Sequence, residues 1–246
     1  LGNVFRSICN SDKWPGYSLG INEMEYNEFN TLIPSIKNHN GWFSKDMILI
    51  CLQGWSNLLV ENKLSKWLDG YSINDQEVSK TIAIICAGNI PMVGFHDILC
   101  GYLADKKLVI KLSSDDAVLI PAVIDLMSKF DENITSQLCF ERNKLKNFDA
   151  VIATGSNNTS RYFKEYFGKY PHIIRKSRTS VAVLNGDESE LDLENLSKDV
   201  FTYYGLGCRN VTKVYLPIGF DLDRIFKGFY KMKQVINNNK YANNYD

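Results

Sequence analysis

The sequence has 246 residues, which is enough for one large α/β domain or for one domain with part of a second. Apolar residues make up 45% of the chain and charged residues 23%, a composition that excludes an intrinsically disordered protein. The 28 basic residues balance the 28 acidic ones, so no net charge favours nucleic acid or an anionic membrane surface. We therefore expect a small-molecule partner and no nucleic acid.

The first part of the chain, up to about residue 75, is predicted to be helical. Apolar residues there recur at intervals of three and four, as Ile48, Leu52, Trp55 and Leu59 illustrate. The strand pattern starts at residues 81–86, a short unbroken apolar run that is typical of a strand buried on both faces. Because strands that are covered on both faces are typical of parallel sheets, we expect a parallel sheet to begin here.

Strands and helices then alternate along the chain. A helix is predicted over residues 92–103, a strand over 107–112, and a helix from the cap-rich turn at 113–116 to about residue 130. Residues 148–153 are predicted to form another buried strand, followed by a helix to about residue 167. This alternation predicts a Rossmann-type, doubly wound parallel sheet.

A second domain is predicted to follow residue 177. Strands are expected at residues 172–176, 179–184 and 211–216, and helices at 193–204 and from residue 222 onward. We therefore divide the chain into a helical region with a dinucleotide-binding domain, residues 1–177, and the beginning of a second α/β domain, residues 178–246. The chain starts with leucine and stops directly after a helical pattern, so we expect the second domain to be truncated.

The cysteines are widely spaced and form no Cys-x-x-Cys pair. With only three histidines among them, this spacing argues against a zinc site, and we expect no metal. We expect reduced thiols in a cytoplasmic protein, because Cys86 and Cys100 occupy apolar elements. No apolar run approaches the roughly 20 residues that a membrane-spanning helix needs.

Cys208 is the strongest candidate for a nucleophile. The glycines Gly205 and Gly207 precede it and reduce side-chain bulk, which would allow a substrate carbonyl to approach the sulfur. The segment resembles a Gly-x-Gly-x-x-Gly phosphate loop only superficially, because it ends in Asn210 and leads from a helix into a strand. An inert cysteine in a tight turn is the alternative.

Three further groups of polar residues follow predicted strands. Asn89 follows the first strand and is placed to donate an N–H to an anionic oxygen, although an ordinary turn asparagine is the alternative. Lys111 lies at the end of the second strand, and its side chain is either a contact for a ribose or phosphate or only a solvated charge. Residues 154–156 (Thr-Gly-Ser) open a helix whose free N–H groups suit a phosphate, unless Ser156 only caps that helix.

Taken together, these segments resemble the aldehyde dehydrogenase superfamily, and most closely its acyl-CoA reductase branch, which includes the bioluminescence fatty acid reductase. The similarity extends over about residues 81–217, and five segments carry it in the family's order: residues 87–97, 108–114, 148–156, 174–183 and 205–208. The resemblance implies an aldehyde-dehydrogenase-like fold. It also implies an enzyme that uses NAD(P)H to reduce an acyl-CoA or acyl-protein thioester to an aldehyde.

The resemblance also implies a role for each candidate residue. Cys208 would accept the acyl group, and Asn89 would stabilise the oxyanion together with the backbone N–H of Cys208. The residues that would bind the cofactor are Lys111, Ser113, Ser114, Thr154, Gly155 and Ser156. We expect NADPH, with NADH as the alternative, because Ser114 would lie near the ribose 2′ oxygen, where a glutamate would repel a 2′-phosphate. We also expect the full-length protein to form a homo-oligomer.

One departure from the superfamily separates the candidate functions. Hydrolytic aldehyde dehydrogenases carry a glutamate base in a Glu-Leu-Gly-Gly segment, and residues 173–176 (Ile-Ile-Arg-Lys) stand in its place without an acid. We therefore expect a thioester reductase. The alternatives are a hydrolytic dehydrogenase that uses another base, such as His172, and an inactive nucleotide-binding subunit.

Overall fold

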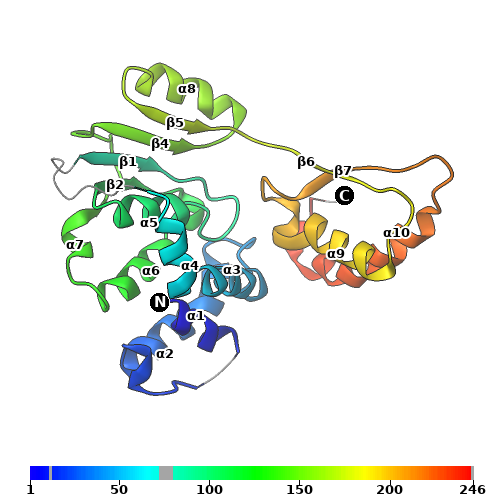
Figure 1. Ribbon diagram of the computed structural model, residues 1–246, viewed down its shortest axis with the longest axis horizontal. Helices are drawn as coiled ribbons and strands as arrows, with labels where there is room; N and C mark the ends of the chain where they lie inside the picture. The colour runs from blue at the N-terminus through cyan, green and yellow to red at the C-terminus, as the bar shows by residue number, and fades with distance from the viewer. Residues whose placement is uncertain (11–12, 72–79, 245–246) are drawn as a thin grey trace. The chain divides into compact units, whose positions relative to one another are not determined.

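The computed structural model describes residues 1–10, 13–71 and 80–244 (Figure 1). The chain forms two compact units. Unit 1 comprises Leu1–Asn40 and Ser44–Lys176, and unit 2 comprises Gly41–Phe43 and Ser177–Asp246. The expected helical region is confirmed up to residue 71, and its last positions, 72–75, lie outside the described residues.

Unit 1 begins with short helical segments, several of which bury apolar side chains. Their bounds are α1 (Gly2–Cys9), η1 (Tyr17–Leu19), α2 (Glu23–Leu32), η2 (Ile33–Asn38), α3 (Lys45–Leu58) and α4 (Glu61–Leu68). Helix α2 starts at a capping box, in which Asn22 and Glu25 satisfy each other's backbone N–H groups. Helix α1 packs against α3, and α2 packs against a helix of the sheet domain, α6 (Leu119–Ser128).

The centre of unit 1 is a five-stranded parallel sheet with the strand order β3-β2-β1-β4-β5. The strands are β1 (Thr81–Ile85), β2 (Lys107–Lys111), β3 (Leu138–Phe140), β4 (Ala150–Thr154) and β5 (His172–Arg175). In β1, the successive residues Ala83 and Ile84 are both fully buried, as expected for a strand covered on both faces. The predicted doubly wound α/β fold is therefore confirmed.

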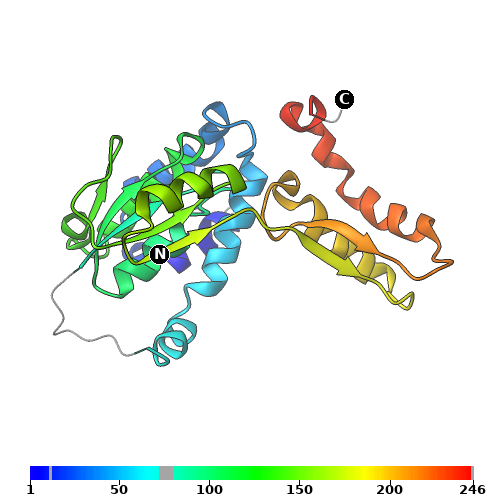
Figure 2. The same ribbon diagram turned by 90° about the horizontal axis from the view of Figure 1, so that it is seen from above.

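Helices connect the parallel strands. They are α5 (Phe95–Leu103), α6, α7 (Ile134–Gln137) and α8 (Asn157–Phe167), with the short η3 (Ser114–Asp116) before α6. Helix α5 packs on β1 and β2, whereas α8 packs on β4 and β5 (Figure 1, Figure 2). A small core between β4 and α8 contains Val151, Ala153 and Phe163.

Two parts of this domain differ from the sequence expectation. Strand β3 was not predicted, because it is only three residues long and two of them, Cys139 and Phe140, are exposed. Helix α5 starts at Phe95 rather than at Met92, because Met92 has a positive φ of 56° and cannot belong to a right-handed helix.

Unit 2 contains a two-stranded parallel sheet of β6 (Ser180–Val183) and β7 (Val211–Tyr215). Its helical elements are α9 (Glu190–Phe201), η4 (Thr202–Gly205), α10 (Leu222–Phe229), η5 (Tyr230–Asn237) and α11 (Asn239–Ala242). Leu193 and Leu196 of α9 pack with Ile225 of α10 against one face of this sheet. Unit 2 is therefore a compact α/β unit of its own.

Helix α9 is shifted from its predicted bounds of 193–204. It begins earlier, because Ser189 and Asp192 form a capping box. It ends earlier, because Tyr203 and Tyr204 both adopt left-handed backbone conformations, with φ values of 54° and 57°.

In the described part of the chain, no helix combines the length and apolar character needed to cross a bilayer.

Candidate functional site

The carboxyl ends of β1, β2 and β4 form one edge of the sheet in unit 1. Ile85 of β1 is in register with Lys111 of β2 and with Ala153 of β4, so the loops that follow these strands emerge next to one another. The chain reverses its direction of winding between β1 and β4, which is the position where open α/β sheets bind ligands. All expected site residues except Cys208 lie along this edge.

The loops after β1 and β2 are in close contact at Gly88. A Cβ atom at this position would lie 2.5 Å from Ser113 Oγ and 2.7 Å from Ser113 Cβ. Only glycine allows the two backbones to approach this closely. The contact brings Ser113 beside the loop that carries Asn89, whose side chain is exposed.

A buried carboxylate links the same two loops. Asp116 is 2% exposed, and its Oδ2 accepts a hydrogen bond of 2.8 Å from Met92 N. Burial raises the pKa of Asp116 to about 6, and the backbone N–H groups of Met92, Ile120 and Leu119 partly offset this rise. Asp116 therefore fixes the left-handed Met92 at the end of the Asn89 loop.

Lys111 and the neighbouring serines provide hydrogen-bond donors at the end of β2. Lys111 Nζ donates to the carbonyl of Asn143 at 2.6 Å, which leaves further N–H donors on the ammonium group. Ser113 Oγ accepts a bond of 3.2 Å from Asp115 N, and Ser114 is exposed. Ammonium and hydroxyl donors suit the ribose hydroxyls and phosphates of a nucleotide.

The loop after β4 leads directly into α8. Ser156 is the N-cap of this helix, and its Oγ accepts a hydrogen bond of 3.1 Å from Thr159 N. A Cβ atom on Gly155 would lie 3.0 Å from Phe163 and 3.1 Å from Thr159, so a larger residue here would press on both side chains. Ser156 thus has the capping role that the sequence left open, and this role leaves the other N–H groups of the first turn available to a phosphate.

The structure places His172 away from this edge. His172 is the first residue of β5 and pairs with Val151, whereas Arg175, at the carboxyl end of β5, pairs with Thr154. Three residue steps of extended strand place His172 about 10 Å from Arg175. The His172 ring lies 2.8 Å from the carbonyl of Tyr170, so its contacts are with the opposite edge of the sheet.

Arg175 forms an ion pair that the sequence did not predict. Its Nη1 lies 2.6 Å from Oδ2 of Asp97, which is 7% exposed, in the first turn of α5. The pair joins the carboxyl end of β5 to the helix that follows the Asn89 loop. No local sequence signal linked Asp97 to a residue 78 positions away.

In unit 2, Cys208 lies on a tight turn between η4 and β7. The turn is closed by a hydrogen bond of 3.0 Å from Asn210 N to Gly207 O. Ser180 Oγ of β6 donates to the carbonyl of Cys208 at 3.3 Å, and the Cys208 side chain is exposed. The thiol is therefore accessible and is carried by a backbone segment with defined contacts.

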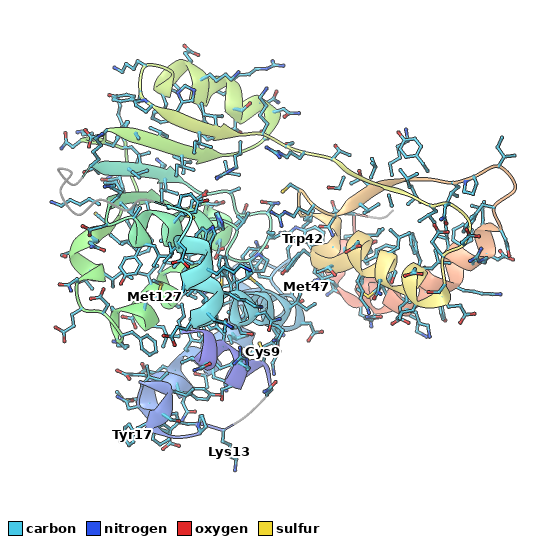
Figure 3. The ribbon with its side chains drawn as sticks, viewed as in Figure 1. Cys9, Lys13, Tyr17, Trp42, Met47 and Met127 are labelled. Atoms are coloured by element: carbon cyan, nitrogen blue, oxygen red, sulfur yellow. The ribbon has the colours of Figure 1, made fainter. Side chains whose placement is uncertain are left out.

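Several other thiols are in settings that oppose ionisation. Burial and the nearby Asp97 and Asp116 raise the pKa of Cys86 to about 12. Burial also raises the pKa of Cys9, which is labelled in Figure 3. Its Sγ donates to the Leu49 carbonyl of α3 at 3.4 Å. Because the thiolate is the nucleophilic form, these cysteines are poor candidates for acyl transfer. All six cysteines are free.

Comparisons with known proteins identify a family and a fold. A family model described as acyl-CoA reductase (LuxC) matches residues 60–221, and a search among curated proteins finds no match. The structure is similar to propionaldehyde dehydrogenase from the Clostridium phytofermentans fucose utilisation microcompartment (TM-score 0.64, 11% identity, covering 95% of this chain and 56% of that one). It is also similar to NAD-dependent benzaldehyde dehydrogenase from Corynebacterium glutamicum (TM-score 0.61, 12% identity, covering 94% of this chain and 52% of that one).

A third similar structure is aldehyde dehydrogenase 21 from Physcomitrella patens, with a TM-score of 0.62 and 12% identity over 95% of this chain and 51% of that one. The chain thus spans about half the length of these proteins. At these identities the similarity shows the fold, which is that of aldehyde dehydrogenases. The family model covers more than half of the chain, including β1 to β7, and the chain therefore belongs to the acyl-CoA reductase (LuxC) family.

Proposed function

We propose that the full-length protein reduces an acyl thioester to an aldehyde through an acyl group carried on Cys208. The Cys208 thiolate attacks the carbonyl carbon, and the thiolate of coenzyme A or of a carrier protein leaves. Asn89 and the backbone N–H of Cys208 stabilise the tetrahedral oxyanion. When bound, a reduced nicotinamide supplies the hydride. The carbon–sulfur bond to Cys208 then breaks, which releases the aldehyde and regenerates the thiolate.

The nicotinamide cofactor is proposed to bind along the carboxyl edge of the sheet in unit 1. Lys111 and Ser114 would contact the adenosine ribose, and Gly155 with Ser156 would face the pyrophosphate. Thr154 would lie near the nicotinamide, and Ser113 would support the ribose end. The ammonium and hydroxyl donors present at this edge fit such a ligand.

We propose NADPH as the preferred cofactor. Ser114 is exposed, follows Lys111 by three positions and carries no charge that would repel a 2′-phosphate. The two following aspartates differ in their settings. Asp116 is buried and accepts a hydrogen bond from Met92 N, so its carboxylate is not presented to the surface. Asp115 is exposed.

The observation that carries the proposal is the exposed thiol of Cys208 on a tight turn, inside the segment that matches the acyl-CoA reductase model. Residues 173–176 offer no carboxylate to activate water, and His172 lies at the opposite end of β5. Without a general base, the rate of hydrolysis should be lower by a factor of about 10² to 10⁴. The acyl group on Cys208 should therefore persist until the reduced cofactor removes it.

The proposal is tested by incubating the full-length protein with acyl-CoA that carries a radiolabelled acyl group. We expect label to accumulate on the peptide that contains Cys208 and to leave as aldehyde when NADPH is added. Cys208→Ala should abolish labelling. The matched control is Cys139→Ala, which removes the other exposed cysteine and should leave labelling unchanged.

Two outcomes would contradict the proposal. Unchanged labelling of the Cys208→Ala variant would assign the acyl group to another residue. Steady formation of carboxylate from aldehyde and oxidised cofactor, without coenzyme A, would indicate a hydrolytic dehydrogenase. If His172→Ala abolished that activity, the base would be His172 despite its position in β5.

A further inference from the structure

The end of α9 leaves backbone carbonyl groups that need hydrogen-bond donors. The helix stops at Phe201, Thr202 is extended with a ψ of 139°, and Tyr203 and Tyr204 are left-handed. The last carbonyls of a helix have no partner within the helix itself. The chain therefore has to supply donors from elsewhere to the carbonyls near the end of α9.

The side chain of Asn210 supplies these donors. It is 7% exposed, and its Nδ2 donates to the carbonyls of Asp199 and Thr202, each at 2.9 Å, with a longer contact of 3.4 Å to Val200 O. The Oδ1 atom of the same carboxamide accepts a hydrogen bond of 2.7 Å from Gly207 N. One amide group therefore ties the end of α9 to the start of the Cys208 turn.

Only an amide of this length can make this set of contacts. A carboxylate has no N–H to give to the two carbonyls, and a shorter side chain cannot reach from the turn to the helix end. The backbone of Asn210 also closes the turn onto Gly207, so both ends of the segment that carries Cys208 depend on one residue. The hydrogen bonds of the Asn210 side chain go to backbone atoms and not to the Cys208 sulfur.

From this geometry we propose that Asn210 is a positioning residue for the Cys208 nucleophile. Its carboxamide holds the Gly207–Asn210 turn against the end of α9. The backbone that carries the thiol and the N–H of Cys208 is thereby fixed in position. This inference rests on the proposed acyl transfer to Cys208. Its consequence is that Asn210 governs the rate of acylation without touching the substrate.

The test compares two reactions of Cys208 in the full-length protein. Acylation by acyl-CoA needs a defined approach to the sulfur and an aligned N–H, whereas alkylation by iodoacetamide, followed on the Cys208 peptide by mass spectrometry, needs only an accessible thiol. For Asn210→Ala we expect acylation of folded protein to fall by about 10- to 100-fold, because misplacement by about 1 Å costs up to 10²-fold. Alkylation should change by less than about threefold.

A matched control is Ser189→Ala, which removes the capping box at the other end of α9. It should lower the melting temperature and leave acylation per folded molecule unchanged. If Asn210→Ala yields no folded protein, Asn210→Ser is measured in the same way. Normal acylation in either folded Asn210 variant would overturn the inference.

The two proposals fail in different ways. If wild-type protein does not acquire an acyl group on Cys208, the proposed function is wrong. If the wild type is acylated on Cys208 and the Asn210 variant reacts at the same rate, only the positioning role is wrong. Equal losses of acylation and alkylation would also contradict positioning, because they would show that the thiol had become inaccessible.

Discussion

Replacing Asp116 with asparagine would remove a buried negative charge from the contact between the loops after β1 and β2. Asparagine keeps an oxygen that can accept the hydrogen bond from Met92 N, so the loop contact itself can persist. The substitution therefore isolates the free-energy cost of ionising this carboxyl group in the folded protein.

The pKa of Asp116 gives the size and direction of the effect. Burial raises this pKa from 3.8 to about 6. Because the folded state holds the proton more tightly than the unfolded state, the stabilisation is fully present below pH 3.8 and is lost as the pH rises through about 6. At 1.36 kcal/mol per pKa unit, the loss amounts to about 3 kcal/mol.

The measurement is the free energy of unfolding in urea between pH 4 and pH 8, followed by tryptophan fluorescence. Three of the four tryptophans, Trp14, Trp55 and Trp67, belong to unit 1 and report on its transition. Relative to Asp116→Asn, the wild type should lose most of this amount, about 2.4 kcal/mol of stability, across this range. A difference between the two proteins that stays constant with pH would refute the reasoning. Asp116→Ala, which leaves Met92 N without its acceptor, should cost a further 1–3 kcal/mol or so at every pH.

Three further substitutions test the proposed site. Asn89→Ala should lower the rate of the chemical step by about 10² to 10³ and leave the cofactor Kd, measured by fluorescence titration, unchanged; a weaker Kd would indicate a structural role. Ser114→Glu should shift the ratio of kcat/KM for NADPH and NADH toward NADH, and an unchanged ratio would remove Ser114 from the ribose site. Gly88→Ala should weaken cofactor binding and cost about 1–3 kcal/mol of stability, because the new Cβ meets Ser113. The control is Gly54→Ala, where nothing lies within 4 Å of the added Cβ and no loss is expected.

Local patterns in the sequence were sufficient for most of the fold. The apolar runs predicted the buried strands β1, β2 and β4, because a strand covered on both faces needs apolar residues at successive positions. The alternation of strands and helices predicted the doubly wound sheet, since parallel strands require crossover connections. The Cys208 segment was recognised as distinct from a phosphate loop because it leads from a helix into a strand.

Other features depended on contacts that no local pattern encodes. Strand β3 exists because three residues pair with β2, and its own residues carry no periodicity. The early end of α9 follows from the left-handed Tyr203 and Tyr204, which are not residues that favour this conformation. Non-glycine residues adopt positive φ angles when surrounding contacts compensate for the strain.

The sequence by itself determined which residue types are available for the chemistry: one cysteine after two glycines, an asparagine after the first strand, and donors after the second and fourth. Only the tertiary structure decided how they are supported. It brought Gly88 against Ser113, Asp116 against Met92 and Asn210 against the end of α9. These pairings join loops that follow different elements, and they arise because parallel strands place their carboxyl ends together and because buried polar groups must find hydrogen-bond partners.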